Sequence, residues 1–256
     1  MKKWLKITIW TLFIGGVITV LVLTENAQGE KIMDEPDVDI LVQGDDAFLN
    51  EDEVKLRLEH AHLIHENQKS SELDIEKIEQ FIQSITQVKA TKVYQLIGGR
   101  WIIEIELRKP VARIFNKYGE DFYVDDEGNA MLTTRVHTAH TVVVTGDIPD
   151  RKNSISVSEI INNDSLRSIR RLDDIYRISD YVCKDPLFRS LIGQMQVEKN
   201  GDFILVPLVG DQKIVFGSAY SEKEVSDKFK KLKIFYEEAM PFEGWDKYSE
   251  ISLKYK

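Results

Sequence analysis

The feature that most limits the possible folds is an uncharged stretch near the start of the chain. Residues 7–24, ITIWTLFIGGVITVLVLT, hold no charged side chain. A helix of about 18–20 residues covers the ~30 Å hydrocarbon layer of a bilayer. Only a helix or a closed barrel satisfies its own backbone hydrogen bonds in that layer. The stretch therefore predicts a transmembrane helix over residues 7–24.

The flanks of this stretch predict how it is inserted. A cleaved signal peptide has a shorter apolar region, of about 7–15 residues, and small residues before its cleavage site. Here Glu25 stands where a small residue is needed, so we favour an uncleaved anchor. Lys2, Lys3 and Lys6 precede the span and acids follow it, so the positive-inside rule places the N-terminus in the cytoplasm. Residues 1–6 are then a cytoplasmic tail, and the chain after the span is extracytoplasmic.

Charge and cysteine content exclude several classes of function for the rest of the chain. The 256 residues carry a net charge of −9, and the three lysines before the span leave −12 for the remainder. Such an acidic domain is a poor partner for nucleic acid or for an anionic lipid surface. Cys183 is the only cysteine, so no intramolecular disulfide can form. We expect contact with the lipid bilayer through residues 7–24 and no nucleic-acid partner.

Residues 74–113 have the clearest secondary-structure pattern outside the anchor. Asp74 can cap a helix, because its carboxylate can accept from the free N–H groups of the first turn. The apolar residues that recur at helical spacing are Ile75, Ile78, Ile82 and Ile85. The period then becomes two, and one strand face holds Trp101, Ile103, Ile105 and Leu107. Gly98 and Gly99 fit a tight hairpin turn. A helix packed on a β-hairpin is the prediction.

A strand and a helix are predicted before this pair. Val38, Ile40 and Val42 alternate along the chain as a short strand, and Gly44 to Asp46 form a turn. Apolar spacing then predicts a helix over residues 49–61. The resulting order over residues 37–109 is β-α-α-β-β, and residues 25–36 link it to the anchor.

His60, His62 and His65 form the one cluster whose composition suggests a metal site. His62 and His65 could share a helix face, but His60 points elsewhere and no fourth ligand is evident. We favour a solvated helix end and expect no metal. Similarly, Asp125 to Asn129 lack the spacing and the late glutamate of a calcium loop. A β-turn with Gly128 in the left-handed conformation is preferred there.

Residues 110–256 predict a second domain, a mostly antiparallel β-domain with flanking helices. The fold class is therefore α+β. Strands are predicted at residues 112–115, 122–124, 140–145, 192–197, 203–209, 213–216 and 250–255. One helix is predicted from Asp164 to Val182, and another opens with a capping box of Ser221 and Glu224.

No combination of residues indicates catalysis. The residues considered were Ser154, Ser156 and Ser158 in a polar loop, Glu104 and Glu106 on the solvent side of a strand, and His137 and His140, for which no partner is identifiable. None of them forms a nucleophile elbow or a pair of facing carboxylates. The basic cluster of Arg167, Arg170 and Arg171 favours a solvated helix face over a phosphate site. We expect no enzyme activity, no cofactor and no small-molecule substrate.

Several motifs in order resemble one family. They are Val88-x-x-Thr91-x-Val93, Arg108-Lys109-Pro110-Val111-Ala112-Arg113, Phe122-Tyr123-Val124-Asp125-Asp126-Glu127-Gly128, Gln194-x-Gln196-Val197, Leu205-Val206-Pro207-x-Val209-Gly210, Ile214-x-Phe216-Gly217, Lys228-Phe229-x-x-Leu232-x-x-Phe235-Tyr236, Gly244-Trp245-x-x-Tyr248 and Ile251-x-Leu253-x-Tyr255. Behind a short tail and an anchor, this series is similar to the FtsQ/DivIB cell-division proteins. The resemblance covers essentially the whole chain.

This resemblance implies a fold and a function. Residues 37–109 would be a POTRA module, and residues 110–256 the β-domain that follows it. The chain would be a non-catalytic single-pass protein of the inner (cytoplasmic) membrane, with a periplasmic domain, at the division site. Its partners would be FtsB-like and FtsL-like bitopic division proteins, and it would link them to septal cell-wall synthesis. The alternative is a POTRA-type adaptor in envelope assembly or protein export.

The last predicted strand is the candidate partner-binding site. Ile251, Leu253 and Tyr255 alternate with Ser252 and Lys254, so one face is buried and the other is polar. Coming last, the strand leaves an open row of backbone groups that a partner strand could pair with. The resemblance places the partner contact on this late part of the β-domain. The candidate residues are Tyr248, Glu250, Ile251, Ser252, Leu253, Lys254 and Tyr255. The alternative is that a helix of the same chain, or missing residues, cover this edge.

Overall fold

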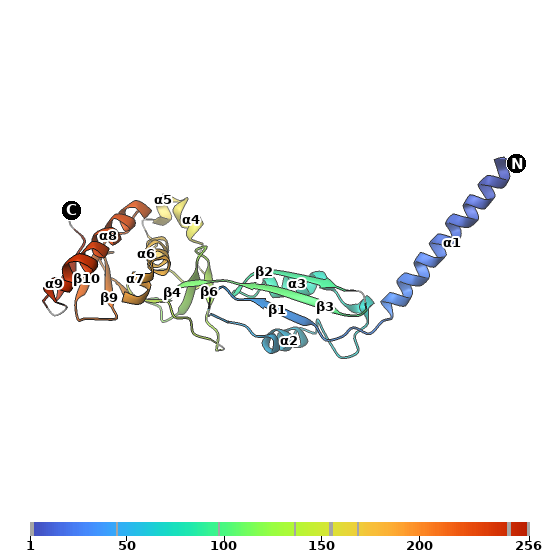
Figure 1. Ribbon diagram of the computed structural model, residues 1–256, viewed down its shortest axis with the longest axis horizontal. Helices are drawn as coiled ribbons and strands as arrows, with labels where there is room; N and C mark the ends of the chain where they lie inside the picture. Colours follow the sequence, from blue (N-terminus) through green and yellow to red (C-terminus); the bar gives the residue numbers. More distant parts are fainter. Residues whose placement is uncertain are drawn as a thin grey trace. The chain divides into compact units, whose positions relative to one another are not determined.

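The protein divides into two units in a computed structural model that describes residues 3–44, 46–96, 98–135, 137–153, 156–167, 169–244 and 247–254. Unit 1 comprises Met1–Leu41 and Leu49–Leu107, and unit 2 comprises Val42–Phe48 and Arg108–Lys256. An apolar helix comes first, a three-stranded sheet follows, and an eight-stranded sheet with helices comes last (Figure 1). This arrangement confirms the predicted α+β class.

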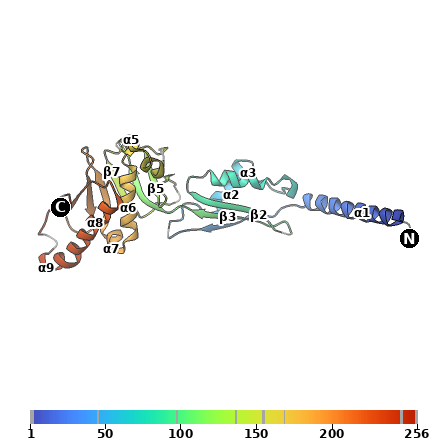
Figure 2. The same ribbon diagram turned by 90° about the horizontal axis from the view of Figure 1, so that it is seen from above.

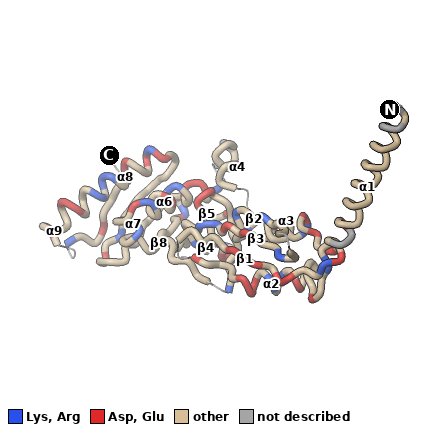
Figure 3. Tube along the Cα trace, turned by 45° about the vertical axis from the view of Figure 1, so that its right-hand side comes forward, with Lys and Arg blue, Asp and Glu red and all other residues tan. Residues whose placement is uncertain are grey.

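The first helix, α1, spans Lys3–Gly29. Its segment Ile7–Glu25 is long and apolar enough to cross a membrane, by length and composition. Figure 3 shows no acidic or basic residue along the middle of α1. Its described apolar side chains are exposed, which fits a single-pass membrane helix.

Unit 1 contains a small sheet with helices beside it. Its elements are β1 Asp37–Leu41, α2 Glu51–His60, the 3₁₀ helix η1 Ser70–Glu72, α3 Ile75–Gln83, β2 Val88–Gln95 and β3 Trp101–Leu107. The strand order is β1-β3-β2, with β1 parallel and β2 antiparallel to β3. The predicted β-α-α-β-β order is therefore present.

Local chemistry explains why α3, β2 and β3 form where they do. The Asp74 carboxylate accepts a hydrogen bond from the Lys77 N–H at 3.1 Å and caps α3. Gly98 and Gly99, in the connection between β2 and β3, both have positive φ, which glycine adopts without a steric cost. The four alternating apolar residues of β3 are all buried. Trp101 also donates its indole N–H to the Asp34 carbonyl at 2.9 Å, which satisfies the polar atom of a buried ring.

Unit 2 is built on one eight-stranded mixed sheet. Its strands are β4 Pro110–Phe115, β5 Asp121–Asp125, β6 Ala130–Leu132, β7 Val142–Gly146, β8 Ile192–Val197, β9 Phe203–Pro207, β10 Lys213–Gly217 and β11 Glu250–Ser252. Their order is β11-β10-β9-β8-β7-β4-β5-β6. Four neighbouring pairs are antiparallel, and three pairs, β4–β7, β7–β8 and β10–β11, are parallel.

Helices pack on this sheet and enclose the main core. They are α4 Val157–Ile161, α5 Asp164–Arg167, α6 Leu172–Lys184, α7 Pro186–Leu191, α8 Glu222–Ile234, the π-helix η2 Phe235–Ala239 and α9 Met240–Glu243. Figure 2 shows the same unit from above. The core joins strand residues such as Ile114, Met195 and Phe216 to helix residues such as Ile178 and Phe229.

The predicted helix over residues 164–182 is wrong as a single element. α5 ends at Arg167 and α6 begins at Leu172. The break has a long-range cause, because the Arg171 N–H donates to the Asp150 carboxylate at 2.9 Å. Ile169, between the two helices, is 64% exposed. The buried stripe of α6 consists of Leu172, Ile175, Ile178 and Val182. The short helices α4 and α7 were not predicted.

The connection after β1 belongs to unit 2, which includes Val42–Phe48. The predicted turn at residues 44–46 lies partly outside the described residues. The Phe48 ring is fully buried, 5.4 Å from the ring centroid of Tyr123 and 5.5 Å from that of His137. His137, for which no partner was identifiable, has its Nε2 2.9 Å from the Asp46 carboxylate.

Gly146 provides a test of the central strands. It ends β7 with φ +112, and an added Cβ would lie 2.1 Å from the Val197 carbonyl oxygen. We expect Gly146→Ala to lower the free energy of unfolding by about 3 kcal/mol or more, since backbone strain and a clash combine. Gly119 has φ +79 and open space around it. Gly119→Ala should therefore cost only about 1 kcal/mol. Urea denaturation measures both, and equal losses would contradict the assigned register.

Candidate functional site

Strand β11 lies at one edge of the eight-stranded sheet and pairs only with β10 among the described strands. The pairing is parallel, with Ile251 beside Ile214 and Ser252 beside Val215. The Leu253 N–H donates to the Val215 carbonyl at 2.9 Å. The Lys213 N–H donates to the Ser249 carbonyl, also at 2.9 Å.

This register determines which backbone groups are available at the edge. In a parallel pair, every second residue directs both its N–H and its C=O toward the same neighbour. Ile251 and Leu253 therefore face β10, and the backbone groups of Glu250 and Ser252 face away from it. No described strand pairs with that outer side. The Ser252 backbone could point either toward β10 or away from it, and in the structure it points away.

Side chains of β11 alternate as the sequence predicts. Ile251 is 9% exposed and belongs to the main core, and Leu253 packs against the same core. Glu250 and Ser252 are exposed. The strand is thus fixed through one face, while the residues of the other face are exposed.

The other candidate residues lie around this strand. Tyr248 is 36% exposed, and its ring centroid is 5.8 Å from that of Phe235. Lys254 contacts the Asp202 carboxylate at 2.5 Å, which ties the end of β11 to the β8–β9 turn. Tyr255 lies outside the described residues, as does Trp245.

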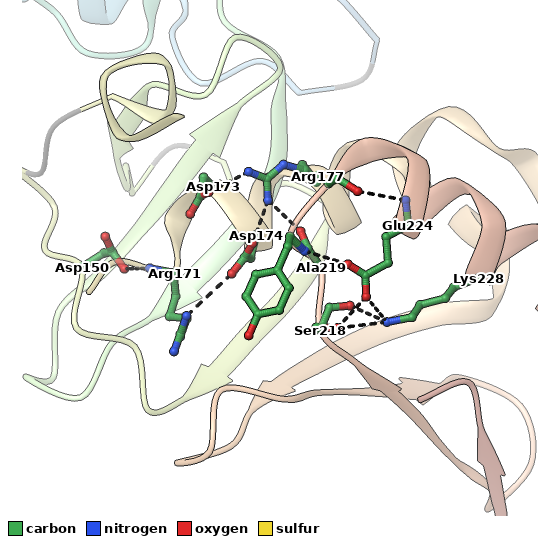
Figure 4. Close-up of polar contacts among 11 residues, drawn as sticks. Asp150, Arg171, Asp173, Asp174, Arg177, Ser218, Ala219, Glu224 and Lys228 are labelled. Atoms are coloured by element: carbon green, nitrogen blue, oxygen red, sulfur yellow. Dashed lines mark hydrogen bonds and ion pairs between the residues drawn. The ribbon is translucent and has the colours of Figure 1, made fainter. Parts of the chain in front are cut away.

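A buried ionic cluster that the sequence analysis did not predict lies next to the β10–α8 connection (Figure 4). Arg177 of α6 donates to the Asp173 carboxylate, the Asp174 carboxylate and the Ala219 carbonyl, each at 2.7 Å. All three charged side chains are buried. Spacings of three and four residues place both aspartates beside Arg177 on α6, which is the signal that could have identified them.

A second buried cation holds the same connection from α8. Lys228 donates to the Ser218 carbonyl at 2.7 Å and to the Glu224 carboxylate at 2.6 Å. Ser221 accepts from the Glu224 N–H as predicted, but the Glu224 side chain accepts from the Tyr220 N–H at 3.1 Å. Only half of the predicted capping box is therefore present.

The predicted basic cluster lies against this buried ionic region. Arg171 places a guanidinium nitrogen 3.8 Å from the Asp174 carboxylate, and Arg170 places one 4.0 Å from the Asp150 carboxylate. The side chain of Arg167 is outside those that the structure describes. Two of the three arginines thus neutralise buried acids, so the interpretation as a simply solvated face is incomplete.

Burial changes the acidity of two of these aspartates. Desolvation, together with the negative charge of Asp173, raises the pKa of Asp174 from 3.8 to about 6, although Arg177 acts in the opposite direction. Desolvation also raises the pKa of Asp150. Loss of solvation on burial is the main cause at both carboxyls, and the negative charge of Asp173 adds to it.

The β-turn predicted at residues 125–129, in preference to a calcium loop, is stabilised by an arginine side chain of the same domain. The Asp125 carboxylate accepts from the N–H groups of Glu127 and Asn129, and Gly128 has φ +81. Arg108 donates to the same carboxylate at 2.6 Å. The β-turn interpretation with a left-handed Gly128 is confirmed.

The remaining polar candidates do not converge on one point. Of the three histidines, His65 has an imidazole nitrogen 3.8 Å from the Glu72 carboxylate. No group of three or more metal-binding side chains gathers among the described residues. Ser156 and Ser158 share a hydrogen bond of 2.9 Å, whereas Ser154 lies outside the described residues. Glu104 accepts from the Tyr94 hydroxyl at 2.7 Å.

Comparison with known proteins points to one family. Residues 109–256, more than half of the chain and most of unit 2, match the family described as FtsQ/DivIB, C-terminal related. A search of curated proteins finds no match to this chain.

The pKa of Asp174 gives a pH-dependent prediction. Between about pH 4 and pH 6, the folded chain keeps a proton on Asp174 that the unfolded chain has released, so this residue contributes less stability as pH rises. Asp174→Asn removes that titration. The free energy of unfolding of the wild type, minus that of the variant, should therefore fall by up to about 3 kcal/mol between pH 4 and pH 7. Urea denaturation at several pH values measures this difference, and a constant or rising difference would contradict the prediction.

Proposed function

The chain belongs to the FtsQ/DivIB, C-terminal related family of cell-division proteins, and on that premise we propose that it is a membrane-anchored, non-catalytic scaffold at the division site. It recruits other bitopic division proteins of the FtsB and FtsL type and links them to septal cell-wall synthesis. The β-α-α-β-β order of residues 37–109 supports a POTRA-like module between the anchor and the β-domain.

The observation that carries this proposal is the outward backbone of β11. An extended partner segment pairs with the N–H and C=O groups of Glu250 and Ser252 and becomes the next strand of the sheet. Backbone bonds supply affinity, and the side chains beside the edge, including Tyr248, select the partner. Because Ile251 and Leu253 hold β11 to the core, the edge exists before the partner arrives.

A second candidate is a POTRA-type adaptor in envelope assembly or protein export. The three-stranded unit with its two helices favours it, since such a unit suits more than one assembly. A fluorescent fusion separates the two functions, because only a division scaffold concentrates as a band at mid-cell.

The membrane orientation has its own test. We propose that α1 anchors the chain in the inner membrane with its N-terminus in the cytoplasm and unit 2 in the periplasm. A reporter that is active only outside the cytoplasm should then work when fused after Lys256 and fail when fused before Met1. Recovery of a soluble protein that starts near Gln28 would show a cleaved signal instead.

Proline substitution at the edge tests strand addition. Ser252→Pro removes an outward N–H and leaves the described bonds to β10 intact, so capture of the FtsB-like partner should fall about tenfold. Ser252→Ala keeps the backbone donor and should capture as well as the wild type does. Leu253→Pro removes the bond to the Val215 carbonyl and should loosen β11 itself. Co-purification with folded variants measures capture, and light scattering reports whether a second copy fills the edge instead. Undiminished capture by both proline variants would refute the proposal.

A further inference from the structure

The position of the edge strand depends on the chain that follows β10. β11 has only three residues in register with its neighbour, so it has few backbone bonds of its own. Gly217 ends β10 with φ +75, and a Cβ there would lie 3.2–3.4 Å from the Cγ, Cβ and Cα atoms of Lys254. The end of β10 at Gly217 and the chain just after β11 are therefore in close contact.

Two buried cations hold this turn from two different helices. Arg177 of α6 binds the carbonyl of Ala219, and Lys228 of α8 binds the carbonyl of Ser218 (Figure 4). The Lys228 ammonium also lies 5.0 Å from the centroid of the Phe216 ring in β10. Adjacent carbonyls are thus fixed from two sides, directly after the strand on which β11 rests.

Arginine is needed at position 177 for geometric reasons. Its planar guanidinium presents donors in a fixed fork, and it contacts Asp173, Asp174 and the Ala219 carbonyl at once. A lysine keeps the positive charge but concentrates its donors on one atom, which cannot reach all three acceptors. Arg177→Lys therefore keeps the charge that neutralises the buried acids but loses the fork of donors that orients the turn.

We propose that Arg177 and Lys228 are positioning residues for partner binding. They fix residues 217–219, so that β11 keeps one position and presents its outward backbone groups in a single conformation. When the edge strand frays, the apparent affinity falls by the fraction of molecules in the competent state. This inference rests on the proposed docking at β11, and it adds that affinity is controlled from inside the domain by residues that do not touch the partner.

The test combines hydrogen exchange with partner capture in the full chain. Arg177→Lys and Lys228→Met are compared with the wild type and with Arg189→Lys, a control on the exposed side of α7. The amides of Ile251 and Leu253 should exchange at least tenfold faster in the first two variants. Amides of the central strands β7 and β8 should change less than twofold, which a merely global loss of stability would not produce. Capture of the FtsB-like partner should fall about tenfold, and Arg189→Lys should match the wild type.

Three results would overturn the proposal. The first is unchanged exchange at Ile251 and Leu253 in both variants. The second is a uniform rise throughout the sheet, and the third is undiminished capture despite faster exchange at β11. If Arg177→Lys fails to fold, Lys228→Met decides, because methionine keeps an unbranched side chain of similar length at that position. Failure of the proposed docking is recognised separately, since Ser252→Pro would then leave capture unchanged while exchange still reports whether these cations position β11.

Discussion

The contact between Arg177 and the Ala219 carbonyl joins the helix layer of unit 2 to the strand that carries its edge. A buried guanidinium is costly unless its donors are satisfied, and here Asp173 and Asp174 supply the opposite charge. Removing Arg177 would take away the cation that both buried carboxylates contact. The raised pKa of Asp174 shows the cost of burying this carboxylate beside Asp173. The benefit is a fixed turn after β10, on which the short strand β11 depends.

Local patterns predicted the elements that depend on neighbouring residues. The alternation in β3, the glycines of its hairpin and the Asp74 cap all act within a few residues, and the structure contains each of them. The errors came from distant partners. The break before α6 depends on Asp150, 21 residues from Arg171, and His137 pairs with Asp46 across 91 residues. No local spacing encodes such contacts. In the buried ionic cluster, spacing on α6 could have identified the two aspartates beside Arg177, but not the Ala219 carbonyl, which is 42 residues away.

The polar residues that resemble binding sites pair with other residues of the fold, whereas no described strand pairs with the outer side of β11. Asp125 holds Arg108, and Arg171 lies against Asp174. On β11, by contrast, alternation predicted a half-buried strand, and only the parallel register showed that Glu250 and Ser252 direct their backbone outward. Recognition through backbone groups needs few special side chains, which agrees with a scaffold that binds other chains.

Amide protection at β11 on partner binding tests the central claim most directly. Hydrogen exchange of the full chain would be measured with and without an extended peptide from the FtsB-like partner. Strand addition predicts that the amides of Glu250 and Ser252, which face away from β10, become strongly protected, while those of Ile251 and Leu253 are protected in both states. Binding of the peptide without any protection at Glu250 and Ser252 would contradict docking at this edge.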